Sequence, residues 1–215
     1  MSQTKYKLII FDFDGTLADS FPWFLSIFED LAAHFHLPAL PRAELEKLRG
    51  MEIQKLIKEF NIPLWKIVQI GNHLQKMMMQ QIHQITLIEG MQSVLDTLVG
   101  EGVRLAVVSS NAEENIRKVL GSHNAAYFEH FECGVSMFGK KSKFLKILKK
   151  TGVSAGHTLC IGDEVRDIQS AKQAHIPFGA VGWGYTHLQI LQTHAPEEVF
   201  HSPQQILQAL NSSNF

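Results

Sequence analysis

Two carboxylates, Asp12 and Asp14, follow a short apolar run at residues 8–11 in the segment LIIFDFDGTLADS. Side chains two residues apart in an extended chain point to the same side, so both acids can face one substrate. The next residue, Gly15, permits a sharp backbone turn. One carboxylate can attack a phosphorus atom as nucleophile while the other protonates the leaving oxygen and then activates water. The pattern therefore predicts a site for the hydrolysis of phosphate esters.

A second pair of acids, Asp163 and Asp167, lies four residues apart in the segment CIGDEVRDI. The first acid ends an apolar run and the second begins a stretch with helical periodicity, so both can face one ion. Carboxylates crowded at one edge repel each other by roughly several kcal/mol at low effective dielectric unless a divalent cation compensates their charge. Hard oxygen ligands beside a phosphate ester favour Mg²⁺. The acids together predict a magnesium site.

The elements that must position these acids are short apolar runs that alternate with helical stretches. Strands are predicted at residues 7–11, 103–108, 157–161 and 178–181, with a weaker one at 133–135, and helices at 113–120, 142–150 and 166–174. Such alternation predicts an α/β fold, a Rossmann-like parallel sheet with helices on both faces. Ligands in such folds gather at the carboxyl ends of the strands, where Asp12, Ser109 and Asp163 would converge.

Residues 18–86 carry no strand signal but show apolar spacing near 3.6 residues at 24–31, 45–57 and 64–79. We expect an inserted α-helical cap domain of about four helices, which lies over the sheet edge. Residues 1–17 and 87–215 would then form the catalytic α/β core domain. Hinges near residues 18–20 and 89–90 would let the cap close and exclude water from the site.

The sequence resembles the haloacid dehalogenase superfamily, and within it the phosphatases with a helical cap of the phosphoglycolate phosphatase type. The resemblance rests on the D-x-D-G-T motif that begins at Asp12, the hydroxyl of Ser109 in VVSSN, a lysine in FGKKSKF, and the pair Asp163 and Asp167. These matches occur in family order, and the helical insertion falls at the family's position. The resemblance implies that Asp12 is the nucleophile and Asp14 the acid and base. The second Asp also disfavours carbon–halogen cleavage, because members with that activity lack it.

The resemblance also implies how Mg²⁺ is held. The family binds the ion through the nucleophilic Asp, the backbone carbonyl of the second Asp and the first acid of the last motif, here Asp12, Asp14 and Asp163. Asp167 would orient a metal-bound water or serve as a further ligand.

Phosphate binding is assigned in the same way. Ser109 would hydrogen-bond a phosphate oxygen, and Lys140 would neutralise the phosphate and the nucleophile. The prolines of the family's K-P-x-P pattern are missing from this chain, so Lys141 or Lys143 could hold the lysine role instead. Further contacts with the substrate are expected from Thr16, Ser110 and Asn111.

Arg49 precedes Gly50, which interrupts the helical pattern of the insert in a way that resembles the family's specificity loop. Arg49 could bind a second anionic group of the substrate, or could equally be a surface arginine at a helix end. Trp183 and Tyr185 follow the last predicted strand and either border the pocket or pack in the core.

Composition excludes other classes of partner. The net charge is −1 over 215 residues and the basic residues are spread along the chain, so the positive stripe that nucleic acid requires is missing. The first apolar run is too short for a signal peptide or a membrane span. Cys133 and Cys160 are the only thiols and sit in no CxxC or Cys/His cluster, which fits a reducing cytoplasm. We expect a cytoplasmic monomer or weak dimer that acts on a small phosphorylated molecule, with no nucleic-acid or membrane partner.

The sequence thus predicts a Mg²⁺-dependent phosphatase that hydrolyses a small phosphomonoester through an aspartyl-phosphate intermediate. A phosphomutase similar to β-phosphoglucomutase is the first alternative; it would use the same site but would need more polar groups than the Met- and Leu-rich insert offers. A non-catalytic phospholigand-binding protein is the second. The complete set of acids weighs against it, because buried carboxylates are costly to retain without a use.

Overall fold

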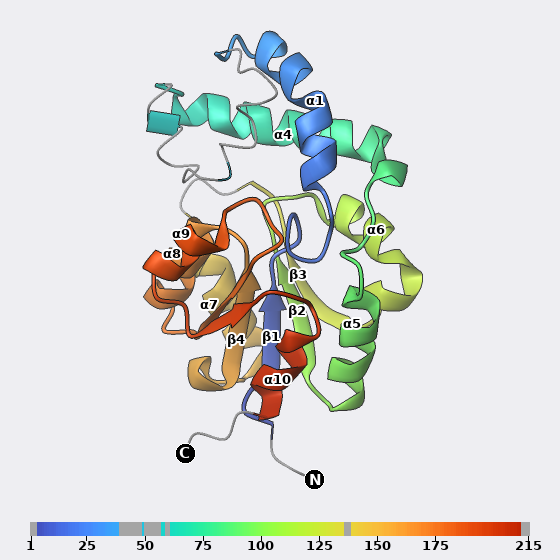
Figure 1. Ribbon diagram of the computed structural model, residues 1–215, viewed down its shortest axis with the longest axis vertical. Helices are drawn as coiled ribbons and strands as arrows, with labels where there is room; N and C mark the ends of the chain where they lie inside the picture. The colour runs from blue at the N-terminus through green and yellow to red at the C-terminus, as the bar shows by residue number, and fades with distance from the viewer. Residues whose placement is uncertain (1–3, 39–48, 50–56, 59–60, 136–138, 212–215) are drawn as a thin grey trace.

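The computed structural model describes residues 4–38, 49, 57–58, 61–135 and 139–211. Six parallel strands form a sheet in the order β3-β2-β1-β4-β5-β6 (Figure 1). Their bounds are β1 (Leu8–Phe11), β2 (Arg104–Val108), β3 (Phe128–Glu132), β4 (Thr158–Gly162), β5 (Phe178–Val181) and β6 (Glu198–Phe200). The order changes direction between β1 and β4, and the carboxyl ends at such a switch point are where open α/β sheets bind ligands. The predicted Rossmann-like fold is confirmed.

The central strands are buried on both faces, which explains their continuous apolar runs. In β1, Ile9 and Phe11 belong to one hydrophobic cluster, whereas Leu8 and Ile10 belong to a second cluster on the other face. Each fully buried side chain of this kind contributes about 1.5–3 kcal/mol relative to exposure. The sheet is therefore held between two separate cores.

Helices cover both faces of the sheet (Figure 1). One face packs against α5 (Met91–Gly100), α6 (Glu113–Ala125) and α10 (Gln205–Asn211), and the other against α7 (Lys141–Thr151), α8 (Val165–Gln173) and α9 (Leu188–Thr193). The described residues also contain two short 3₁₀ turns, η1 (Ile82–Gln84) and η2 (Ala155–His157). Within the described residues, no helix combines the length and the apolar character that crossing a bilayer demands.

Two strands differ from the prediction. The weak strand predicted at 133–135 is wrong: β3 ends at Glu132 and occupies residues 128–132. This edge strand pairs only with β2 in the described structure. Its sequence FEHFE keeps Phe128 buried and Glu129 exposed, so it lacks the apolar run by which buried strands are recognised. The short strand β6 was not predicted, because only Phe200 of its three residues is buried.

Two helices of the insert lie beyond the carboxyl ends of the strands, α1 (Phe21–His34) and α4 (Leu64–Gln80) (Figure 1). They confirm the helical stretches predicted at 24–31 and 64–79. The helix predicted at 45–57 falls almost entirely outside the described residues.

The backbones that lead into and out of this insert are paired with each other. The Asp19 N–H donates to the Thr86 carbonyl and the Ile88 N–H to the Leu17 carbonyl, both at 2.9 Å. An antiparallel bridge joins Ala18 to Leu87 between them. The predicted hinge at 18–20 therefore lies in a two-stranded linker.

Candidate active site

Asp12 and Lys140 form the centre of the site. Asp12 comes directly after β1, at the switch point, and Lys140 directly precedes α7. The Lys140 ammonium lies 2.6 Å from Asp12 Oδ2 and 2.9 Å from Asp167 Oδ1. The second oxygen of Asp12 accepts the backbone N–H of Phe13 at 2.7 Å. All three side chains are buried, so the Lys140 ammonium and the carboxyl groups depend on one another for compensation.

Asp163 follows β4 beside this pair and is completely buried. The Thr16 hydroxyl donates to its Oδ1 at 2.9 Å, and the Tyr185 backbone N–H donates to its Oδ2 at 2.7 Å. Oxygens of Asp12, Asp163 and Asp167 all lie within 4.8 Å of one another. The fold thus gathers three acids that lie up to 155 positions apart in the sequence, as the parallel topology requires.

Two glycines let the backbone come this close to Asp163. A Cβ on Gly15 would lie 2.4 Å from Asp163 Oδ2, and one on Gly184 would lie 2.2 Å from Asp163 Cβ. Gly15 also has φ +70°, a conformation that other residues rarely adopt. The turn after β1 and the loop after β5 therefore clamp the acid from both sides.

The charges of the site divide its acids into two kinds. Burial by itself would raise the pKa of Asp12, but the Lys140 ammonium outweighs it and holds that pKa below its ordinary value. Burial raises the pKa of Asp167 to about 8, against the opposing effect of Lys140, and raises the pKa of Asp163 well above its ordinary range. Burial and the charge of Asp12 raise the pKa of Asp14 to about 6. Asp12 is therefore the anionic member, as a nucleophile must be.

The comparisons with known proteins show the family of the chain. The family described as haloacid dehalogenase-like hydrolase matches residues 9–181. The chain belongs to this family. It is 26% identical over 205 residues to a phosphoglycolate phosphatase from Synechococcus elongatus, covering 95% of this chain and 97% of that one. A 5'-nucleotidase from Pseudomonas aeruginosa is 24% identical, covering 89% and 90%. The predicted membership, and with it the hydrolase class, is confirmed.

The fold recurs in solved structures. A predicted phosphoglycolate phosphatase from Haemophilus somnus superposes with a TM-score of 0.74 at 20% identity, covering 96% of this chain and 99% of that chain. At this level of identity the likeness shows a shared fold and nothing finer.

The candidate lysines of this hydrolase occupy different places. Lys140 reaches Asp12, whereas Lys141 is exposed on α7. Lys143 donates to the carbonyl oxygens of Ser109 and Gly134, at 2.9 and 2.6 Å. Among the described lysines, Lys140 alone makes an ion pair with an acid of the site.

The residues expected to contact substrate are already engaged. Ser109 is buried and its hydroxyl accepts the Asn111 backbone N–H at 3.1 Å. The Ser110 carbonyl accepts the side-chain amide of Gln75 at 2.6 Å, and the Asn111 amide donates to Asp14 Oδ2 at 2.9 Å. Thr16 is held by Asp163, as described above. Their roles in substrate binding stay predictions.

Arg49 lies against the loop after β5. Its guanidinium donates to the Gly184 carbonyl and lies over the Phe21 ring, 4.8 Å from the centroid. Its own carbonyl accepts the His187 N–H at 2.8 Å. Arg49 thus joins the insert to the loop that holds Asp163, and a contact with substrate stays a prediction.

Three contributors to the site carry no motif in the sequence. They are the backbone N–H of Tyr185, the close approach of Gly184 and the buried amide of Asn115, which donates to Asn111 Oδ1 at 2.9 Å. The GWGY segment directs attention to the first two, but Asn115 resembles any polar residue of a helix.

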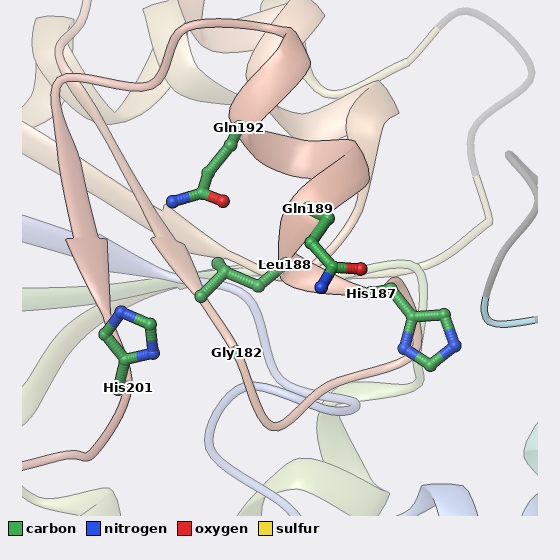
Figure 2. Close-up of a pocket in the computed structure, with 6 residues that line it drawn as sticks. All are labelled: Gly182, His187, Leu188, Gln189, Gln192 and His201. Atoms are coloured by element: carbon green, nitrogen blue, oxygen red, sulfur yellow. The ribbon is translucent and has the colours of Figure 1, made fainter.

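A separate cavity of about 390 Å³ lies beside α9 (Figure 2). Its lining shares no residue with the carboxylate cluster: Gly182, His187, Leu188, Gln189, Gln192 and His201. It is a different feature of the surface from the candidate active site.

Proposed function

We propose that this chain is a phosphatase that hydrolyses a small phosphomonoester through attack of Asp12 on phosphorus. One observation carries the proposal. The Asp12 carboxylate, kept anionic by Lys140 at 2.6 Å, stands at the switch point beside two further buried acids, with Asp14 two residues away. The phosphatases and the nucleotidase among the curated relatives support the same reaction class.

In the proposed first step, Asp12 forms a bond to phosphorus as the bond from phosphorus to the ester oxygen breaks. Asp14, whose pKa lies near 6, gives its proton to the departing alkoxide. Asp14 then takes a proton from water, which attacks the phosphorus of the aspartyl-phosphate as the bond from phosphorus to the Asp12 oxygen breaks, so that inorganic phosphate leaves and the Asp12 carboxylate is regenerated. The Lys140 ammonium compensates negative charge on the phosphoryl oxygens throughout.

The residues of the site fit a magnesium ion. Asp12, Asp163 and Asp167 offer a compact set of hard oxygen donors, and among the described residues Asp167 Oδ2 is buried with no hydrogen-bond donor. When bound, Mg²⁺ supplies charge compensation for the phosphoryl group. Thr16 and Tyr185 would hold Asp163 in a fixed orientation towards the ion through their hydrogen bonds to its two oxygens.

We also propose that residues 18–86 act as a cap domain over this site, with residues 1–17 and 87–215 as the core. The position of α1 and α4 beyond the strand ends supports this division. The two free cysteines, Cys133 and Cys160, support a reducing compartment such as the cytoplasm. A monomer or weak dimer is the assembly we propose.

The curated relatives name two kinds of substrate, so we propose phosphoglycolate and nucleoside monophosphates as the first to test. Purified protein would be assayed for phosphate release with Mg²⁺ and with EDTA, as wild type, as Asp12→Asn and as Asp30→Asn, an exposed control on α1. We expect Asp12→Asn and EDTA each to abolish release while Asp30→Asn keeps it. Phosphate release that survives in Asp12→Asn would refute the nucleophile. Isomerised sugar phosphate without free phosphate would indicate the mutase.

A further inference from the structure

We propose that Asn111 and Asn115 are positioning residues that orient Asp14, and that contacts with α4 help to hold them in place. The proposal rests on the proposed function, in which Asp14 is the acid. Both asparagines are buried, Asn111 in the loop after β2 and Asn115 in the first turn of α6. They connect the insert to the acid through a chain of hydrogen bonds.

The direction of this chain is fixed at both ends by backbone groups. The Gln75 carbonyl can only accept, so the Asn115 group 2.9 Å from it is the NH₂. The same NH₂ donates to Asn111 Oδ1 at 2.9 Å. The Ala112 backbone N–H can only donate, and it lies 2.8 Å from that same oxygen. The Asn111 amide therefore cannot be flipped, and its NH₂ must face Asp14 Oδ2 at 2.9 Å.

This arrangement distinguishes the two oxygens of Asp14. Oδ2 accepts the Asn111 amide, whereas no hydrogen bond from a described residue reaches the buried Oδ1, although the Ser20 hydroxyl also lies near this carboxylate and lowers its pKa. An oxygen that accepts from a fixed donor is a poor place for a proton, so Oδ1 is the one left to serve the substrate. The asparagines thus select which oxygen of Asp14 acts.

Helix α4 contacts both asparagines of this hydrogen-bond chain. Gln75, Met78 and Gly71 share one face of the helix, at the spacing that brings residues onto one side. Met78 Sδ lies 2.9 Å from the Asn111 NH₂, and the Gln75 amide donates to the Ser110 carbonyl at 2.6 Å. If α4 moved away, Asn111 would lose the sulfur and Asn115 would lose the Gln75 carbonyl. Contact with α4 therefore supports the orientation of the acid, and the Ala112 N–H holds the Asn111 amide from the core side.

The test compares two esters. An aryl ester such as p-nitrophenyl phosphate loses a stable anion and needs little proton donation, whereas an alkyl phosphate needs an acid. The constant kcat/KM covers the steps through loss of the leaving group, so it reports on the acid rather than on the water step. The alkyl/aryl ratio of kcat/KM also cancels the fraction of folded enzyme. It is therefore insensitive to a merely structural defect.

We would measure this ratio in wild type, Asn115→Asp, Asn115→Leu and the control Asn124→Leu, which removes a buried asparagine of the same helix that bonds to Gln92 and Leu120. We expect the ratio to fall about 10-fold or more in both Asn115 variants, a part of the usual contribution of a general acid, and to stay unchanged in the control. In an Asp14→Asn background, Asn115→Leu should cause no further fall, because coupled residues are not additive.

An equal loss of kcat/KM for both esters would overturn the positioning role of the asparagines. So would a full additional fall of the alkyl/aryl ratio in the Asp14→Asn background. Neither result would affect the proposed phosphatase activity. A wild-type enzyme without Asp12-dependent phosphate release would overturn both proposals together. The two failures are thus separated by the wild-type assay.

Discussion

At the scale of the residue, Asp12 is placed between opposing influences. Burial favours its neutral form, yet the pKa is lowered because Lys140 lies in direct contact. The lysine is held in turn by Asp12 and Asp167, which raise its pKa although burial lowers it. A buried ion pair of this kind is weak as a source of stability but effective for fixing charge at one point.

Replacement of Lys140 by Met should lower kcat/KM by about 100-fold or more, because the phosphoryl oxygens and the nucleophile lose their fixed positive partner. Lys141→Met is the matched control, since that neighbouring side chain is exposed. Steady-state kinetics on one phosphomonoester gives kcat/KM for the two variants and the wild type. An Lys140→Met enzyme as active as Lys141→Met would mean that the ammonium has no part in the reaction.

The sequence could predict the acids of the site because each lies in a short segment with its own spacing. Asp12 and Asp14 share one segment, and Asp163 and Asp167 share another. The Thr16 hydrogen bond to Asp163 spans 147 positions, and no local pattern encodes such a contact. Asn115 could not be found either, because one polar residue in a helix carries no sign that it is buried.

At the scale of the element, one loop must leave room for an acid of the site. Gly184 lies in the loop after β5, where a Cβ would stand 2.2 Å from that of Asp163. The position of Asp163 therefore depends on the backbone of this loop as well as on the end of its own strand.

Gly184→Ala should therefore displace Asp163 and weaken Mg²⁺ binding, by analogy with the 10- to 100-fold losses seen when partners of metal ligands are altered. Gly156→Ala is the control, because a Cβ there meets nothing within 4 Å. Titration calorimetry with Mg²⁺ gives the affinity of each variant. Equal affinities in the two variants would show that the loop does not support Asp163.

Helix α4 also packs closely against the core, at Gly71. A Cβ there would lie 2.8 Å from a methyl carbon of Val135 but 3.8 Å from its Cβ. Gly71→Ala should thus raise KM and lower kcat by lifting the helix, and Val135→Ala should restore both when combined with it. If the double variant is as impaired as Gly71→Ala alone, then this contact does not seat the helix.

The strands that are buried on both faces could be predicted, because each has a continuous run of apolar residues, as in β1, β2, β4 and β5. The edge strands β3 and β6 carry charged or exposed residues, so one was misplaced and the other missed. The helix predicted at 113–120 runs on to Ala125, but Gly121 within it is non-helical with φ 69°. The predicted end of the helix at residue 120 therefore coincides with a non-helical residue, after which the chain is helical again.

At the scale of the whole molecule, two cores on opposite faces of the sheet support one acidic edge. The folded protein must keep several carboxylates out of water there, and this links its stability to pH and to metal. Asp167 has an ordinary pKa of 3.8 when exposed and one of about 8 in the folded protein without metal. The folded state therefore binds more protons between these values, and stability falls as pH rises through that range.

Added Mg²⁺ should raise Tm more at pH 8 than at pH 6, and its binding should release protons, because the ion requires the deprotonated acids. Asp167→Asn should reduce this pH dependence, to which the raised pKa values of Asp14 and Asp163 also contribute, and the reduction separates the effect from titration of the eleven histidines. Thermal unfolding in EDTA and in Mg²⁺ across this range provides the measurement. A metal-induced shift of Tm that is the same at both values would contradict the linkage.

The hydrogen-bonded linkers at residues 17–19 and 86–88 restrict how the insert can move. Because the two linkers are hydrogen-bonded to each other, one cannot move without the other. We therefore expect α1 and α4 to move together about the paired linkers. Along α4, Gly71 lies against Val135 and Met78 lies against Asn111, seven residues further on. A tilt of the helix would therefore change the contact with Val135 and the contact beside the acid by different amounts.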